Sequence, residues 1–151
     1  MKSSFKFLSI TFLVLMSLGI VSCNKEADDE IIPVVELTSE EASNLLYMRE
    51  EEKLVRDVYV FLFEKYNMSI FENISGSEQK HMDFVLDIMN EYSYEDNAAA
   101  AYGEFNNSEL QDLCNDLIAK GSVSLYDALV VGATIEDVEI YDLNTAIDET
   151  D

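Results

Sequence analysis

The chain contains few of the residues that interrupt helices, with one Pro and five Gly among 151 residues. Sandwiches of short strands need frequent turns, and turns rely on these two residue types, so the composition argues against such a fold. Apolar residues make up 48% of the chain, which is enough for a core, and this length is typical of one domain. The composition therefore favours a few long helices in a single all-α domain.

Positive charge is also scarce. Nine Lys and Arg stand against 31 Asp and Glu, which gives a formal net charge of −22 at pH 7. A surface of this sign repels the phosphate backbone, so nucleic acid is excluded as a partner. Two reasons for the acidic excess stay open: it concentrates cations near the protein, or it serves solubility alone.

Residues 1–22 are interpreted as an export signal rather than as part of the fold. Lys2 and Lys6 form a basic start, and residues 7–21 form an apolar run that is short for a membrane span. The run ends in Ile20-Val21-Ser22-Cys23, which resembles the lipobox of bacterial lipoproteins, whose Cys is lipidated and becomes the first mature residue. An ordinary secretory signal with a chance Cys is the alternative.

Lipidation implies a membrane anchor at Cys23, followed by an acidic tether over residues 23–36. Asn24 replaces the Asp that commonly retains lipoproteins at the inner membrane, so we expect an anchor in the bacterial cell envelope, at the outer membrane or cell surface. A lipidated Cys23 leaves Cys114 without a disulfide partner. Its apolar neighbours favour a small buried residue over a nucleophile or a metal ligand.

Capping signals and apolar periodicity predict four helices. Thr38-Ser39-Glu40-Glu41 is a capping box that begins a helix ending near residue 66. Ser108 with Gln111 repeats the capping pattern, and Ser122 or Ser124 caps the last helix. The other predicted helices cover residues 71–92, with a break near Gly76, then residues 109–120, and a last stretch that ends near residue 147.

Charged side chains interrupt the apolar stripes of three of these helices. Glu52 lies on the first stripe, Glu78 and His81 on the second, and Glu136 and Glu139 on the last. Such stripes face the core, and burying an ionised carboxylate costs several kcal/mol unless something pairs with it. No Lys or Arg shares these stripes, whereas divalent metal suits this ligand set, with Fe, Mn or Zn as candidates. Protonated or solvated Glu side chains in a purely structural domain are the alternative.

Residues near these candidate ligands are expected to be solvated or to pack in the core rather than to bind metal. Glu50 and Glu51 are expected to be solvated, since only Glu52 shares the stripe. Tyr59 is expected in the core, and contact with a metal ligand is the alternative. Gly132 costs about 1 kcal/mol against Ala inside a helix, so its inward position predicts a close approach between helices.

Three segments resemble an uncharacterised domain family of the ferritin-like superfamily, related to rubrerythrins. They are residues 48–59 (MREEEKLVRDVY), 77–83 (SEQKHMD) and 132–140 (GATIEDVEI). The resemblance covers residues 37–151 and implies a ferritin-like helical bundle, up-down with a crossover. Its first-helix ligand falls on Glu52, its Glu-x-x-His on Glu78 and His81, and its Glu-x-x-Glu on Glu136 and Glu139.

The resemblance further implies a di-metal carboxylate site, with iron as the first choice. Glu52 and Glu136 would be terminal or bridging ligands, Glu78 would bridge, His81 would cap one ion, and Glu139 would be bridging or mobile. The implied chemistry is oxidation of ferrous iron by oxygen or peroxide. A helical lipoprotein that only buffers metal or docks a partner, without catalysis, is the alternative.

One departure concerns the number of ligand-bearing helices. Ferritin-like domains have four core helices, and the short helix over residues 109–120 carries no inward ligand, so we expect it in the crossover rather than as the fourth. The expected domain is then incomplete. Either it is a fragment that stops before the fourth core helix, or a homo-oligomer or second chain supplies that helix, or the site is vestigial.

Overall fold

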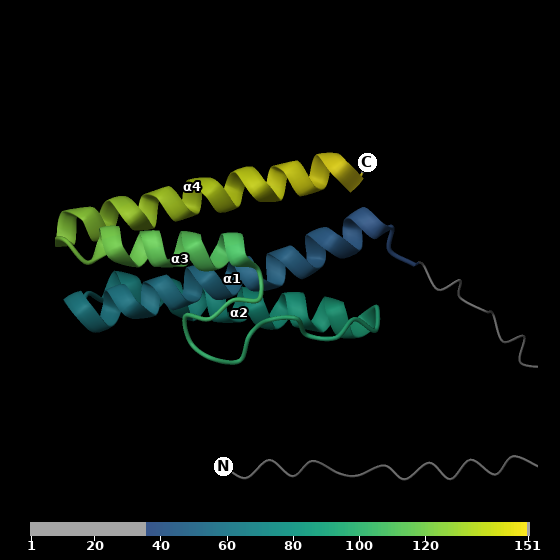
Figure 1. Cartoon of the computed structure of the whole chain (residues 1–151), viewed down its shortest axis with the longest axis horizontal. Helices are drawn as coiled ribbons and strands as arrows, with labels where there is room; N and C mark the ends of the chain where they lie inside the picture. The colour runs from purple at the N-terminus through teal and green to yellow at the C-terminus, as the bar shows by residue number, and fades with distance from the viewer. Residues whose placement is uncertain (1–35, 151) are drawn as a thin grey trace, which may run out of the picture. The chain divides into compact units, whose positions relative to one another are not determined.

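Four helices and no strand make up the part of the chain that the computed structural model describes, residues 36–150 (Figure 1). The helices are α1 (Ser39–Tyr66), α2 (Ser69–Glu91), α3 (Ser108–Gly121) and α4 (Leu125–Thr150). The all-α helical bundle expected from the sequence is thus confirmed. The predictions for the signal, for lipidation of Cys23 and for most of the tether concern residues outside this range. Within it, no helix combines the length and apolar character needed to cross a membrane.

The predicted start of α1 is confirmed in atomic detail. The Oγ1 of Thr38 accepts a hydrogen bond from the backbone N–H of Glu41 at 3.2 Å, and the Glu41 carboxylate accepts from the Thr38 N–H at 2.7 Å. This reciprocal pair satisfies two amide donors that the first helical turn leaves free. The helix ends at Asn67, whose left-handed backbone (φ 50°, ψ 39°) stops the helical path.

Two predicted details of the later helices are wrong. The break near Gly76 is absent, and α2 runs unbroken through this glycine. Phe71, which precedes Gly76, and Met82, which follows it, are both buried and hold the two parts of the helix in place. Ser108 does not cap α3: the Asn107 side chain accepts from the N–H groups of Glu109 and Leu110. The side-chain oxygen of Asn107 accepts from the first turn of the helix, and asparagine is at least as good a cap as serine.

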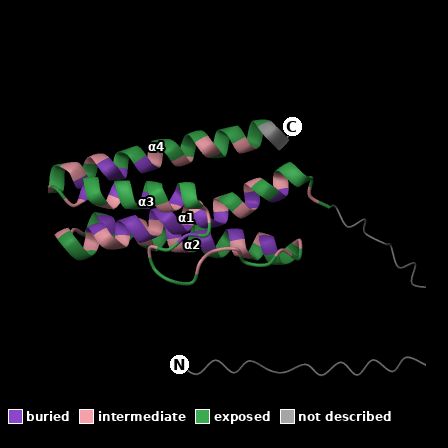
Figure 2. Ribbon diagram, in the orientation of Figure 1, coloured by how far each residue is buried: buried purple, intermediate pink, exposed green. Residues whose placement is uncertain are grey.

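The helix α1 lies at the centre of the bundle and contacts α2, α3 and α4. The helices α3 and α4 also pack together, whereas α2 contacts neither of them within residues 36–150. Figure 2 shows the buried residues concentrated on α1. The short helix α3 belongs to this core, to which it contributes Leu110, Cys114 and Leu117. Cys114 is buried as predicted, and burial raises the pKa of its thiol to about 11, so it is no nucleophile at neutral pH.

One face of α1 is polar and holds the connector between α2 and α3. The ammonium group of Lys53 pairs with Asp57 at 2.7 Å and donates to the carbonyl oxygens of Ala101 and Glu104. The carboxylate of Asp57 also accepts from the backbone N–H of Gly103 at 2.9 Å. Lys53 and Asp57 are fully buried, and these partners satisfy the charges that burial would otherwise penalise.

Glu50 anchors the start of α3 from a distance in sequence. Its carboxylate accepts hydrogen bonds from the backbone N–H groups of Asn106 (2.6 Å) and Asn107 (3.0 Å). Only 3% of Glu50 is exposed, so the prediction that it is solvated is wrong. The apolar stripe identifies the face of α1 that packs on helices, but it does not reveal that a loop covers the opposite face.

Candidate metal centre

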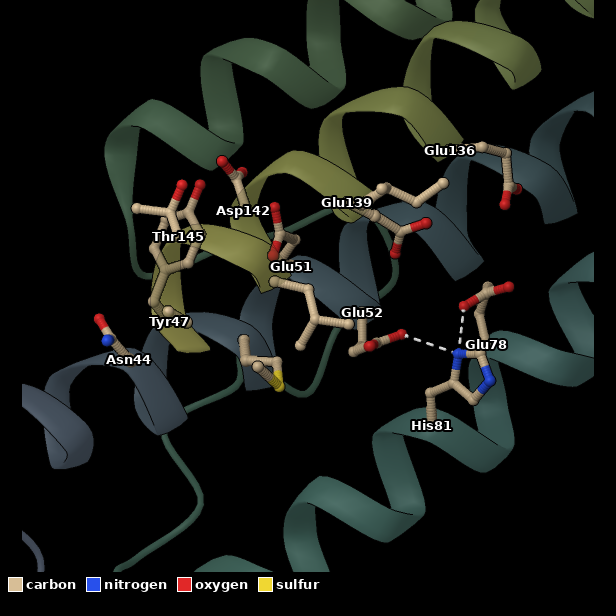
Figure 3. Close-up of a pocket in the computed structure, with 14 residues that line it drawn as sticks. Asn44, Tyr47, Glu51, Glu52, Glu78, His81, Glu136, Glu139, Asp142 and Thr145 are labelled. Carbon is tan, nitrogen blue, oxygen red and sulfur yellow. Dashed lines mark hydrogen bonds and ion pairs between the residues drawn. The ribbon is translucent and has the colours of Figure 1, made fainter. Parts of the chain in front are cut away.

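A cleft of about 340 Å³ lies between α1, α2 and α4, and we call it the acidic cleft (Figure 3). All five residues predicted as metal ligands line it, although their role as ligands stays a prediction. Its ionisable residues, apart from Tyr47, are Glu51, Glu52, Glu78, His81, Glu136, Glu139 and Asp142. No Lys or Arg stands among the described residues that line the cleft, so its negative charges have no basic neutraliser there.

Three of these side chains converge closely. The Nδ1 of His81 lies 2.8 Å from an oxygen of Glu78 and 3.3 Å from an oxygen of Glu52, and Figure 3 shows the three groups meeting. One ligand atom from each lies within 4.8 Å of the other two. The Glu-x-x-His spacing brings Glu78 and His81 to one face of α2, and α1 supplies Glu52 from the facing helix.

Burial of this triad is uneven. The side chain of Glu78 is 6% exposed and that of Glu52 is 16% exposed, whereas that of His81 is 57% exposed. The carboxylates therefore form the floor of the triad, and the imidazole forms its solvent side.

The Oε2 of Glu52 is buried, and it is the oxygen that lies 3.3 Å from His81 Nδ1; it accepts no hydrogen bond of standard geometry among the described residues. A single imidazole nitrogen carries at most one proton, and the Glu78 oxygen at 2.8 Å is a closer acceptor for it than the Glu52 oxygen at 3.3 Å. Burial raises the pKa of Glu52 to about 7, the neighbouring Glu78 adds to that rise, and His81 opposes it. A cation among the three groups would satisfy the unpaired oxygen, so the donor set fits a metal ion.

The helix α4 places two more acidic groups over the triad. Burial raises the pKa of Glu139 to about 9, and the nearby charges of Glu78 and Glu52 raise it further. Glu139 therefore holds a proton at neutral pH in the metal-free protein. It lies outside the group of three closest ligand atoms, as does Glu136.

Glu136 is held by Tyr59. The buried Tyr59 hydroxyl donates a hydrogen bond to Glu136 at 2.7 Å, and its ring packs tilted against Phe71 with centroids 6.2 Å apart. A Cβ added to Gly132 would lie 3.1 Å from the Tyr59 hydroxyl oxygen, so the predicted close approach between helices is present. Tyr59 is both a core residue and the partner of a predicted ligand.

Sequence reasoning missed the second carboxyl pair of the cleft. Glu51 is half-buried beside Asp142, so the prediction that Glu51 is solvated is wrong. Burial raises the pKa of Glu51 to about 8, and its hydrogen bond with Asp142 contributes to the rise. A spacing signal existed for Asp142, because it follows Glu139 by three residues and so lies near it on the helix surface.

Comparison with known proteins gives a family and an experimental fold. The sequence pattern of the uncharacterized protein domain DUF2202 matches residues 41–151. The uncharacterized protein MJ0754 of Methanocaldococcus jannaschii is 45% identical over 121 residues, which cover 80% of this chain. The aligned region spans 65% of that relative, which is less than two thirds of its length.

A solved structure has a similar fold. The crystal structure of hypothetical protein MJ0754 from Methanococcus jannaschii matches with a TM-score of 0.76 and 45% identity. The match covers 80% of this chain and 69% of the solved one. Neither description names an activity, so these similarities show the family and the fold.

Proposed function

The chain belongs to the DUF2202 family of uncharacterized domains, and from that premise we propose that it binds divalent metal in the acidic cleft. One observation carries the proposal: Glu52, Glu78 and His81 bring three ligand atoms within 4.8 Å of one another. The buried, unpaired oxygen of Glu52 supports it, because a cation there would remove an uncompensated polar atom. Carboxylates with an imidazole suit Fe, Mn or Zn.

We assign Glu136 and Glu139 to a second ion, with iron as the preferred metal. The Glu-x-x-His on α2 and the Glu-x-x-Glu on α4, both lining one cleft against α1, support a relation to the ferritin-like superfamily. A bound iron pair would catalyse the oxidation of ferrous iron by oxygen or peroxide. In this assignment Tyr59 orients Glu136, and Glu139 releases its proton when it becomes a ligand.

We also propose that the domain works outside the cytoplasm, tethered through lipid on Cys23. The lipobox-like Ile20-Val21-Ser22-Cys23 supports this location. Expression with a labelled fatty acid tests it. The label should enter the native chain and be absent from Cys23→Ala, and equal labelling of both would refute the anchor.

Metal titration of the purified chain tests the cleft. We expect calorimetry with Mn²⁺, and with Fe²⁺ under anaerobic conditions, to show binding that Glu78→Gln and His81→Gln weaken by roughly a hundredfold. Asp87→Asn is the matched control, because Asp87 is an exposed carboxylate on the same helix that does not line the cleft. Equal affinity in the native chain and both cleft variants would exclude this site.

A non-catalytic metal buffer is the second candidate, and the exposure of His81 favours it. A ligand that is 57% exposed lets ions exchange with solvent, as uptake and release require. Ferrous iron under air separates the two functions: an oxidase speeds iron oxidation, whereas a buffer binds the ion without turnover.

The hypothesis that the domain is purely structural predicts a different outcome. Glu78→Leu combined with His81→Leu would then raise stability and remove no metal binding, because apolar side chains replace buried polar ones. That result would overturn both metal functions.

A further inference from the structure

A second, smaller cavity of about 40 Å³ lies between α1, α3 and α4, and we call it the apolar cavity. Each of these three helices contacts the other two, and Figure 1 shows them side by side. Seven of the ten residues that line the cavity are Leu, Ile or Val, and the other three are Glu51, Thr134 and Glu139. Its walls are therefore mainly hydrocarbon.

The apolar cavity borders both the protein surface and the acidic cleft. Leu113 and Val138 are each 39% exposed, whereas Val55 is buried. Glu51 and Glu139 line the apolar cavity and also line the acidic cleft. A molecule held in the apolar cavity would thus lie beside two carboxyl groups of the candidate metal centre.

The polar groups of the apolar cavity are poor partners for water. The Thr134 hydroxyl donates to the backbone carbonyl of Val130 at 2.8 Å, and Glu51 is hydrogen-bonded to Asp142. A buried water molecule makes two to four hydrogen bonds, and cavities lined by apolar side chains stay dry. The lining therefore favours an apolar occupant over water.

The volume of the apolar cavity limits the size of that occupant. A space of about 10–15 Å³ holds one water-sized molecule, and an engineered cavity of about 150 Å³ binds benzene. At about 40 Å³ the apolar cavity has room for a diatomic gas and is too small for an aromatic ring. Dioxygen is apolar and gains by leaving water, whereas hydrogen peroxide would lose its hydrogen bonds there.

We propose that the apolar cavity binds dioxygen and delivers it to the acidic cleft. Delivery rests on the proposed oxidation of ferrous iron, whereas the binding of gas requires no metal. Each dioxygen molecule would accept two electrons from two ferrous ions, which become ferric, and two protons from solvent, and it would leave as hydrogen peroxide. The two reactants would use different sites, because the negative charge of the acidic cleft attracts cations and the apolar cavity suits a neutral gas.

Nuclear magnetic resonance of the metal-free full chain under dioxygen pressure tests the binding. Dioxygen is paramagnetic and speeds the relaxation of nearby methyl protons, with the same sample under nitrogen as the reference. We expect the enhancement at Val55, Leu110 and Ile135 to exceed that at Val58 and Val131 roughly twofold or more, because only the first three line the cavity although all five are buried. Equal enhancement in the two sets would overturn the proposal.

Variants of one residue locate the gas. Leu113→Trp adds bulk to the cavity wall and should reduce the enhancement at Val55 roughly twofold, whereas Leu113→Ala widens the cavity and should increase it. Leu129→Trp is the control, because Leu129 is an exposed leucine of α4 that lines neither the acidic cleft nor the apolar cavity. Circular dichroism verifies that each variant folds. An unchanged enhancement in both Leu113 variants would place the gas elsewhere and refute the site.

Ferrous iron oxidation tests the delivery. We expect Leu113→Trp to raise the apparent KM for dioxygen roughly threefold and to leave the affinity for Mn²⁺ and the rate with hydrogen peroxide unchanged, because neither depends on an apolar site. Leu129→Trp should match the native chain in all three measurements. An equal KM for dioxygen in the two variants would refute delivery.

Failure of this proposal and failure of the metal site give different results. A chain that binds metal but shows equal methyl relaxation in the two sets would refute the apolar cavity as a gas site alone. A chain that binds no metal but shows the unequal relaxation would refute the cleft assignment, and delivery with it, and would support the gas site.

Discussion

At the scale of single residues, Tyr59 joins the core to the acidic cleft. Its ring is 1% exposed and packs in the main apolar cluster, while its hydroxyl donates to Glu136 at 2.7 Å. A buried hydroxyl without a partner would be destabilising, so this hydrogen bond allows the core to approach an acidic site. Tyr66 offers a comparison within the same helix, because its hydroxyl donates to the backbone carbonyl of Gly121 at 2.8 Å.

Removing each hydroxyl separates these roles. We expect Tyr59→Phe to lower the free energy of unfolding by about 1.5–3 kcal/mol, because its hydrogen bond reaches a carboxylate, and Tyr66→Phe to lower it by about 0.5–1.5 kcal/mol. Urea denaturation measures both values. If Glu136 is a ligand, metal affinity should fall in Tyr59→Phe and persist in Tyr66→Phe. Identical metal affinity in both variants would detach Tyr59 from the site.

At the scale of helices, three glycines occupy different environments. Gly76 is exposed inside α2, and a Cβ there would meet no heavy atom of the described residues within 4 Å. Gly121 ends α3 and is buried, and a Cβ there would lie 2.8 Å from a methyl carbon of Leu62. Gly132 of α4 lies between these cases, with Tyr59 3.1 Å from the added carbon.

These environments predict opposite signs for one substitution. Gly76→Ala should raise the free energy of unfolding by about 0.5–1 kcal/mol, because alanine restricts the unfolded chain and favours the helix. Gly121→Ala should lower it by about 1–3 kcal/mol, because the packed Leu62 must move. Thermal unfolding followed at 222 nm measures both. A destabilised Gly76→Ala would indicate that α2 is not regular at this position.

The helices themselves were largely predictable from the sequence. The Thr38 capping box and the apolar periodicity of α1 place its ends correctly, because both are local signals. The break expected at Gly76 rests on the low helix propensity of glycine, and it is wrong. Phe71 and Met82, which flank this glycine, are buried, and the contact of α2 with α1 holds the helix together. Tertiary contacts of this kind are not visible in a local pattern.

The acidic cleft was predictable where residues share a stripe. Glu52, Glu78 and His81 were selected because they interrupt apolar periodicity, and they lie together. Glu50 and Glu51 were misjudged, because their surroundings come from distant segments: the connector before α3 covers Glu50, and Asp142 of α4 meets Glu51. A stripe identifies one face of a helix, whereas these two residues lie on the others.

At the scale of the whole molecule, the net negative charge and the carboxyl groups of the cleft both lower the stability of the folded chain as pH rises. The formal charge is −22 at pH 7, and self-repulsion of that charge grows as carboxyl groups ionise. Within the cleft, burial raises the pKa of Glu52 to about 7, that of Glu51 to about 8 and that of Glu139 to about 9. These groups bind protons more tightly in the folded chain than in the unfolded chain, where carboxyls titrate near 4.5.

The sign of the pH dependence follows from proton binding. Between pH 4.5 and 9 the folded state holds more protons than the unfolded state, so its stability falls as pH rises. The contribution of these carboxyls is complete below about pH 4.5 and is lost as pH rises through about 7 to 9. Metal reverses the trend, because ligand carboxylates bind it in their deprotonated form.

We therefore expect the Tm of the chelator-treated chain to fall from about pH 5 to about pH 9, and added Mn²⁺ to raise Tm most at the alkaline end. Circular dichroism melts at each pH, with and without Mn²⁺, measure both effects.

Glu139→Gln should flatten the dependence of Tm on pH in chelator, because the carboxyl with the largest rise in pKa among these three no longer titrates. Asp87→Asn, on the exposed face of α2, should retain the slope. Self-repulsion alone would leave the two variants with the same slope, so equal slopes would show that the cleft carboxyls do not control stability. A Tm that rises with pH in chelator would mean that these carboxyls are ionised in the folded chain. A group other than metal would then hold these carboxyls in their charged form, which would weaken the case for a metal ion in the cleft.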